Sequence, residues 1–176
     1  MGYLRAYYLP MLGTPLLLTF VRNNEMNDFS IPRVRNEFGF EPSEANFIRP
    51  KKRPLSSCTP IIAAFPDGSL SIVIGAAGGS RIISSTAQTL WHILDHNMTT
   101  AEALRQPRLH DQLMPNYIMV EYAFDNSTVA SLEERGHNIT WVRPGLSAVQ
   151  GIRVIEDGFF EAASEPRQPN SGIGVA

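Results

Sequence analysis

The sequence has little cysteine, little charge and no long uninterrupted apolar run. Its single cysteine, Cys58, cannot form a disulfide within the chain, so cysteine content does not indicate the redox compartment. Charged residues make up only 18% of the chain and the net charge is -2, which argues against a surface for nucleic acid or for an acidic membrane. Proline and glycine interrupt the apolar stretch before Val21, which is therefore too broken for a membrane span and matches a signal peptide poorly.

What is present is the composition of a folded enzyme domain. A chain of 176 residues, 43% of them hydrophobic, can bury a real core. The 13 glycines and 13 prolines indicate many loops, and we find no repeat or low-complexity tract. Three glycosylation sequons fit a secreted origin, although such sequons also arise by chance; their asparagines are Asn97, Asn126 and Asn138.

Apolar periodicity and turn signals predict an α+β fold. Pro66-Asp67-Gly68 is a strong turn signal between two apolar runs, residues 59–65 and 69–75, and predicts a hairpin. Because both runs are apolar on both faces, we expect this hairpin to lie inside a layered fold. The other predicted elements are strands at 14–21, 139–142, 149–155 and 159–163, and helices at 80–95, 99–106 and 125–135.

A diglycine lies where the second arm of the hairpin meets the first predicted helix. The string Gly-Ala-Ala-Gly-Gly-Ser-Arg at residues 75–81 follows an apolar run and precedes helical spacing. Gly78 and Gly79 would leave backbone N–H groups pointing at whatever lies there, as in an oxyanion hole or an anion site. The Lys-Ser/Thr ending of a P-loop and the Rossmann glycine spacing are both absent.

Two polar clusters upstream could bind a charged ligand. Glu25 and Asp28 are acids three residues apart in a polar loop, and converging carboxylates can hold an ammonium group. Ser56 and Ser57 are adjacent hydroxyls, which together with backbone N–H groups can donate to a carboxylate. Taken alone, they are explained more simply as solvated loop acids and an ordinary turn. Asp28 is the better candidate for a buried functional acid because it adjoins apolar Phe29.

Four strings in this chain resemble the small, catalytic subunit of γ-glutamyltranspeptidases, also called glutathione hydrolases. They are NNEMNDFS, RPLSS, GAAGGSRI and PRLHDQ, and they occur in the family's order and at its spacing. The resemblance runs from about Asn23 to the end of the chain, whereas residues 1–22 look like no part of the family. We therefore predict a non-matching segment at 1–22 and a small-subunit-like domain at 23–176.

The resemblance implies a fold, a substrate and a set of roles. The fold would be the αββα four-layer sandwich of N-terminal-nucleophile hydrolases, incomplete in this chain. The substrate would be a γ-glutamyl compound such as glutathione. Glu25 and Asp28 would hold its α-amino group, Ser56 and Ser57 its α-carboxylate, and the N–H groups of Gly78 and Gly79 would form the oxyanion hole. No cofactor is implied, the family's large subunit would be the partner, and the full-length family is secreted or membrane-associated.

The family's reactive group is missing from this sequence. In the family a threonine becomes the N-terminus of the small subunit, its hydroxyl attacks the γ-glutamyl carbonyl, and its own amine is the base. Thr14 and Thr19 lie in no Thr-Thr-His-like motif. Two interpretations stay open: a γ-glutamyltransferase chain with a misassigned start that retains half the substrate site, or a non-catalytic truncated product or partner-dependent module. Under either, we expect the isolated chain to be inactive.

The other reactive side chains carry weaker signals. Cys58 has no adjoining cationic neighbour and is interpreted as a small core residue rather than a nucleophile. His92 and His96 have metal-capable spacing on one predicted helix, but no third ligand of obvious type accompanies them, so we predict no metal site. His110, in the PRLHDQ string, is interpreted as a packing residue.

Overall fold

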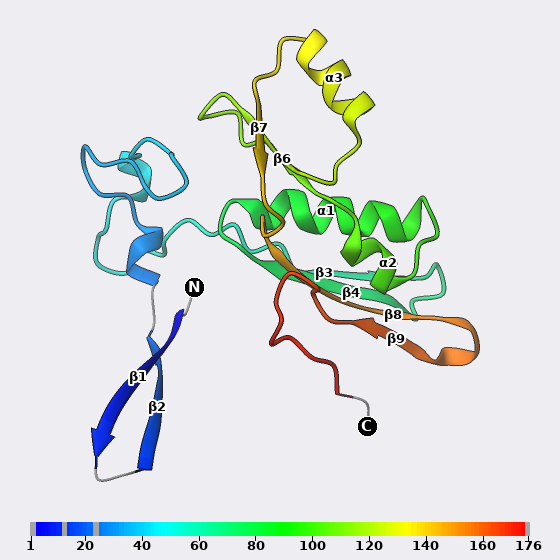
Figure 1. Cartoon of the computed structure of the whole chain (residues 1–176), viewed down its shortest axis with the longest axis horizontal. Coiled ribbons are helices and arrows are strands. Elements are labelled where there is room, and N and C mark those ends of the chain that lie inside the picture. The colour runs from blue at the N-terminus through cyan, green and yellow to red at the C-terminus, as the bar shows by residue number, and fades with distance from the viewer. Residues whose placement is uncertain (1–2, 12–13, 23–24, 175–176) are drawn as a thin grey trace. The chain divides into compact units, whose positions relative to one another are not determined.

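The computed structural model describes residues 3–11, 14–22 and 25–174, and divides into two compact units, Met1–Ser56 and Ser57–Ala176 (Figure 1). The division falls between the two neighbouring serines Ser56 and Ser57.

The first unit contains one two-stranded sheet followed by a long irregular segment. Strand β1 (Tyr3–Met11) pairs antiparallel with β2 (Thr14–Arg22), and β2 confirms the strand predicted at 14–21. Two 3₁₀ turns follow, η1 (Glu25–Asp28) and η2 (Glu44–Asn46). The Asn46 side chain ties the segment together, because its Nδ2 donates to Asp28 O at 2.8 Å and its Oδ1 accepts from Leu55 N at 2.9 Å.

The second unit is built on a four-stranded antiparallel sheet in the order β3-β4-β8-β9. Its strands are β3 (Ile61–Ala64), β4 (Leu70–Ala77), β8 (Ala148–Val154) and β9 (Phe160–Ala163). Strands β3 and β4 form the predicted hairpin. Gly68 occupies a positive φ of 87° in its turn, and Asp67 Oδ1 accepts from Ser69 N at 2.9 Å.

Two helices cover one face of this sheet (Figure 1). They are α1 (Arg81–Leu94) and α2 (Thr100–Arg105). The α2 helix begins with the predicted capping box, since Thr99 and Glu102 satisfy each other's backbone N–H groups. The core between helices and sheet consists of buried side chains from both, including Ile72, Ile74, Ile93, Leu104 and Val149.

The opposite face of the same sheet is apolar and exposed. Ile62, Val73 and Ile152 lie side by side on β3, β4 and β8, with exposures of 75%, 39% and 46%. The described residues supply helices for only one side of the sheet, which agrees with the prediction of an incomplete αββα sandwich. The hairpin strands are apolar on both faces, as predicted, and among the described residues the second face stays exposed.

A smaller three-stranded sheet carries the third helix. Strand β6 (Ile118–Glu121) pairs with β5 (Leu109–His110) antiparallel and with β7 (Ile139–Val142) parallel. Helix α3 (Asn126–Glu134) connects β6 to β7 and packs Val129 against Ile118 and Val120. The predictions of α3 and β7 are confirmed, whereas β5 and β6 were not predicted.

Candidate functional site

The diglycine occupies a turn that requires glycine. Gly78 has a φ of 145° and Gly79 a φ of 63°, both in the region that L side chains rarely adopt. A Cβ on Gly78 would lie 3.1 Å from the Cα of Ser147, so there is also no room for a side chain there. The turn joins β4 to α1, as the sequence predicts; its role as an oxyanion hole stays a prediction.

Ser80 follows the diglycine at the N-cap position of α1, but its side chain does not cap the helix. Serine at this position usually accepts a hydrogen bond from an N–H of the first turn. Here the Ser80 hydroxyl donates instead to Gln112 Oε1 at 2.8 Å. Helix α1 begins two residues after Gly79, so the positive end of its dipole, which favours negative charge, lies next to the diglycine in the chain.

The two predicted amine-binding acids lie together in the single 3₁₀ turn η1. Glu25 and Asp28 are both exposed, so the expectation that Asp28 is a buried acid is wrong. The neighbouring apolar residue, Phe29, turns partly inward while Asp28 points outward. The Asp28 backbone is nevertheless anchored through its carbonyl by Asn46.

The two predicted carboxylate-binding serines lie in an extended segment. Ser56 is exposed and Ser57 is half-buried, with Ser57 O accepting from Thr59 Oγ1 at 3.0 Å. Cys58 beside them is exposed, so its interpretation as a core residue is wrong. A cysteine between polar neighbours in an extended segment has no apolar surroundings to draw it inward.

The site candidates are divided between the two units. Glu25, Asp28 and Ser56 belong to the first unit, and Ser57, Gly78 and Gly79 to the second. The structure brings the two acids together and brings the two glycines together with Ser147 and Ser80.

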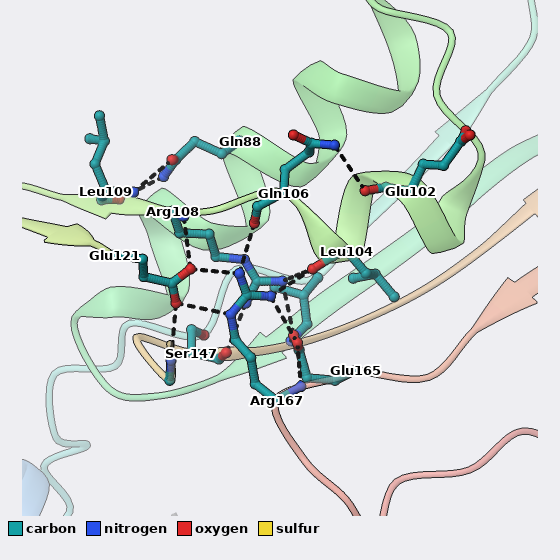
Figure 2. Close-up of polar contacts among 12 residues, drawn as sticks. Gln88, Glu102, Leu104, Gln106, Arg108, Leu109, Glu121, Ser147, Glu165 and Arg167 are labelled. Carbon is teal, nitrogen blue, oxygen red and sulfur yellow. Dashed lines mark hydrogen bonds and ion pairs between the residues drawn. The ribbon is translucent and has the colours of Figure 1, made fainter. Parts of the chain in front are cut away.

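A buried cluster of four charged residues includes Arg108, which donates to Ser147 O (Figure 2), and Ser147 in turn lies against Gly78. Arg108 Nη2 pairs with Glu165 Oε2 at 2.9 Å, and Arg167 pairs with Glu121 at 2.6 Å and with Glu165 at 3.1 Å. Arg167 also donates to the carbonyls of the α2 C-terminus. Sequence reasoning missed this cluster, because its members are far apart along the chain and only the fold brings them together.

Burial and pairing together shift the pKa values of three members of the cluster. Burial acts to raise the pKa of Glu121, but hydrogen bonds from Arg167 and from the amides of Gly145 and Arg108 outweigh burial, so its pKa is lowered. Burial acts to lower the pKa of Arg167, yet Glu121 and Glu165 hold that pKa above its usual range. For Arg108 burial dominates and lowers the pKa, opposed by Glu165.

The histidines fall into two settings. On α1, the ring centroids of His92 and His96 lie 5.6 Å apart, and burial, followed by His96 and Arg108, lowers the pKa of His92. Within the described part of the chain, no group of three or more histidine, cysteine or acidic side chains is arranged to hold a metal ion. His110 is buried on β5 and bonds to Ser84 and Gln112.

Comparison with known proteins gives the class and the family. The fold is that of the N-terminal-nucleophile hydrolases: a chain of Helicobacter pylori γ-glutamyltranspeptidase, solved as its T380A mutant, superposes with a TM-score of 0.76 at 30% identity. That match covers 93% of this chain and 99% of the other. The family model described as Gamma-glutamyltranspeptidase matches residues 13–175. The chain therefore belongs to the γ-glutamyltranspeptidase family.

Curated relatives agree with this assignment. A glutathione hydrolase proenzyme from Arthroderma benhamiae is 51% identical over 152 residues, covering 86% of this chain and 26% of the relative. Scoloptoxin SSD20 from Scolopendra dehaani is 38% identical over 154 residues, covering 88% of this chain and 78% of that protein. The chain thus spans about a quarter of the length of this glutathione hydrolase, and the word proenzyme in the relative's name is consistent with a partner subunit.

The predicted domain boundary at residue 22 and the individual site roles stay predictions.

Among the described residues, no helix is both long enough and apolar enough to cross a membrane.

Proposed function

We propose that this chain forms the substrate-binding half of a γ-glutamyltransferase, or glutathione hydrolase. The complete protein would cleave or transfer the γ-glutamyl group of glutathione and its conjugates. The observation that supports this most directly is the diglycine turn, with its two positive φ angles, at the N-terminus of α1 in a chain of this family.

Each binding candidate has a distinct electrostatic task. A γ-glutamyl group carries an α-ammonium, which Glu25 and Asp28 would bind as carboxylates. Ser56 and Ser57 would donate hydrogen bonds to its α-carboxylate. When a nucleophile attacks the γ-carbonyl, negative charge develops on the carbonyl oxygen, and the N–H groups of Gly78 and Gly79 would stabilise it.

Two parts of the site would come from outside these 176 residues. These residues contain no Thr-Thr-His-like motif, so the threonine nucleophile and its amine base would be supplied by another segment. A large subunit is the proposed partner. The exposed apolar face of the sheet, with Ile62, Val73 and Ile152, offers a surface that a further layer could cover.

The test compares the chain alone with a complete assembly that includes a nucleophile-bearing segment. On a γ-glutamyl anilide, the assembly should turn over and the 176-residue chain should not, because losing the nucleophile removes roughly a million-fold in rate. Family-level turnover by the chain alone, or an inert assembly that folds and binds partner normally, would contradict the proposal.

The amine-binding role has its own test in the same assembly. Asp28→Asn should raise KM for the γ-glutamyl anilide about tenfold, because it weakens a charge-assisted bond to the ammonium. A glutaryl anilide, which lacks the α-amino group, should be affected much less. The matched control is Glu37→Gln, another exposed acid of the same loop segment. Equal losses on both substrates would refute the assignment of Asp28.

A second candidate function is a non-catalytic, partner-dependent binding module. It is favoured by one observation: this chain spans 78% of the length of scoloptoxin SSD20, so a curated relative of comparable length exists. Such a module would bind a partner chain without adding turnover. Binding measured by calorimetry, with no gain in γ-glutamyl hydrolysis on complex formation, would favour the module over the enzyme.

We also propose that the complete protein is secreted or membrane-associated. The asparagines of all three sequons are exposed, so each could carry a glycan without disturbing the core: Asn97, Asn126 and Asn138. Expression in a secretory eukaryotic host should give a mass shift that an N-glycosidase removes.

A further inference from the structure

The string PRLHDQ, residues 107–112, reaches the diglycine turn from two sides. Most of its length lies in or beside the two-residue strand β5 (Leu109–His110). The string is prominent in the sequence, yet none of its side chains has a role in the proposed substrate site. Its contacts show a different task.

The first contact runs through Gln112 to the residue after the diglycine. Ser80 Oγ donates to Gln112 Oε1 at 2.8 Å, and His110 Nε2 lies 2.9 Å from the same oxygen. Gln112 Nε2 donates to Met114 O at 3.0 Å, which fixes the orientation of the amide. A carbonyl oxygen only accepts, so His110 carries a proton on Nε2, and its Nδ1 lies 2.7 Å from Ser84 Oγ. Ser84 is thereby in contact with His110 on β5, and Ser80 with Gln112, two residues beyond the strand.

Arg108 makes the second contact, with Ser147, the residue that lies against Gly78. Arg108 Nη1 donates to Ser147 O at 2.8 Å, and Ser147 Oγ donates to Ala77 O at 2.6 Å. Ser147 is also the residue that a Cβ on Gly78 would strike. Arg108 therefore fixes the surface against which the turn rests.

The buried ion cluster holds this second contact rigid. Glu121 Oε1 accepts from Gly145 N at 3.0 Å, and Glu165 Oε2 accepts from Val149 N at 2.8 Å. These two carboxylates clamp the backbone on either side of Ser147. A site whose supporting residues are locked by packing and hydrogen bonds can hold donors within a few tenths of an ångström of the productive geometry.

We propose that Arg108 and Gln112 are positioning residues that hold the Gly78–Gly79 turn, one from each side. The strongest sign is Ser80, a residue type and position suited to helix capping, whose hydroxyl is given to Gln112 instead. The geometric part of the proposal stands on these contacts alone. Its catalytic part rests on the proposed function, in which the turn binds the oxyanion.

The experiment substitutes Gln112 and studies the variants both as the chain alone and as the chain bound to its co-expressed partner. Gln112→Met removes the oxygen that accepts from Ser80 and His110, whereas Gln112→Glu keeps an oxygen there. Gln106→Met is the matched control, because the Gln106 side chain makes one long bond, 3.4 Å, to Glu102 O. The first readout is the amide resonances of Gly78, Gly79 and Ser80 in labelled protein, and the second is kcat and KM of the active assembly on a γ-glutamyl anilide.

Gln112→Met should shift the Gly78 and Gly79 amide resonances, Gln112→Glu should restore them, and Gln106→Met should leave them unchanged. In the active assembly, Gln112→Met should lower kcat about tenfold to a hundredfold with KM within about twofold, as for a small misplacement of catalytic groups. Ser147→Ala, which removes the hydroxyl that donates to Ala77 O, should also shift the glycine resonances and lower kcat.

Unchanged glycine resonances in Gln112→Met, or an equal change in Gln106→Met, would overturn the proposal. A parallel rise in KM would mean that Gln112 supports substrate binding rather than the turn, and would also overturn it. If the wild-type assembly is inert while the resonances respond as expected, the proposed function fails and the positioning role stands.

Discussion

At the scale of single residues, the four charged side chains of the buried cluster depend on one another. Glu121 is fully buried and accepts from Arg167 and from the amides of Arg108 and Gly145. Because a buried charge is tolerated only while it is paired, the loss of one member leaves the others uncompensated.

Glu121→Gln should therefore destabilise the second unit by about 3–5 kcal/mol, since it leaves Arg167 with one buried partner fewer. Urea unfolding followed by circular dichroism measures this. Arg35→Gln is the matched control, because the Arg35–Glu41 pair is exposed and screened by solvent, and its loss should change little. A small cost for Glu121→Gln would show that the cluster is redundant.

The proposed oxyanion role of Gly79 depends on one group, its backbone N–H. Proline, the usual way to delete a backbone N–H, fixes φ near -65° and is incompatible with the φ of 63° at Gly79. Glycolic acid in place of Gly79 replaces the N–H by an oxygen and leaves the glycine-like freedom of the backbone intact.

In the active assembly this ester should lower kcat about a hundred- to a thousandfold, with a small change in KM, because it removes one donor to the developing oxyanion. The same ester at exposed Gly172 serves as the control. Normal kcat in the correctly folded Gly79 ester would mean that the glycine is needed only for the shape of the turn.

The exposure and the contacts of individual side chains were the features hardest to predict from the sequence. The positions of the diglycine and of the paired acids along the chain could be predicted from local strings. The exposure of Asp28 and Cys58 could not, because one apolar neighbour does not determine which way a side chain points. Two partners of the Arg108 guanidinium, Ser147 and Glu165, lie 39 and 57 residues away, and no local pattern encodes them.

At the scale of elements, helix starts were the most predictable features. Thr99 Oγ1 accepts from Glu102 N at 3.2 Å, and Glu102 Oε2 accepts from Thr99 N at 2.9 Å, as the sequence predicts. This signal is local, so a single sequence contains all of it. Strands β5 and β6 were missed because they have two and four residues, and their pairing with distant segments defines them more than their composition does.

Thr99→Ala should destabilise the second unit by about 1 kcal/mol, because α2 carries buried Thr100 and Leu104 and cannot fray without disturbing the core. Thr99→Ser should restore most of the loss. Thr140→Ala, at an exposed position of β7, is the control. Equal unfolding midpoints for Thr99→Ala and wild type would show that packing alone holds this helix.

At the scale of the whole molecule, the second unit has one covered and one uncovered sheet face. Side chains on β3, β4 and β8 form a continuous exposed apolar row: Ile62, Val73 and Ile152. Exposed apolar surface of this kind promotes association with other chains.

The chain without a partner should therefore self-associate in size-exclusion chromatography, and the double variant Val73→Thr with Ile152→Thr should shift it toward the monomer. Leu113→Ser, at an 80% exposed loop residue away from the sheet, should leave the elution unchanged. A monodisperse wild-type monomer with fixed near-UV circular dichroism would instead indicate an autonomous module.

The contact between Ser147 and the diglycine turn also affects the order in which the second unit can form during synthesis. The bond from Ser147 Oγ to Ala77 O spans 70 residues, so it forms only after a long loop has closed. Ribosomes add about 5–20 residues per second, and 70 residues therefore take roughly 4–14 s to emerge. For most of that interval the hairpin β3–β4 and helix α1 have already been synthesised, while the turn between β4 and α1 still lacks its support. The contact that supports the diglycine turn thus forms late in the synthesis of the chain.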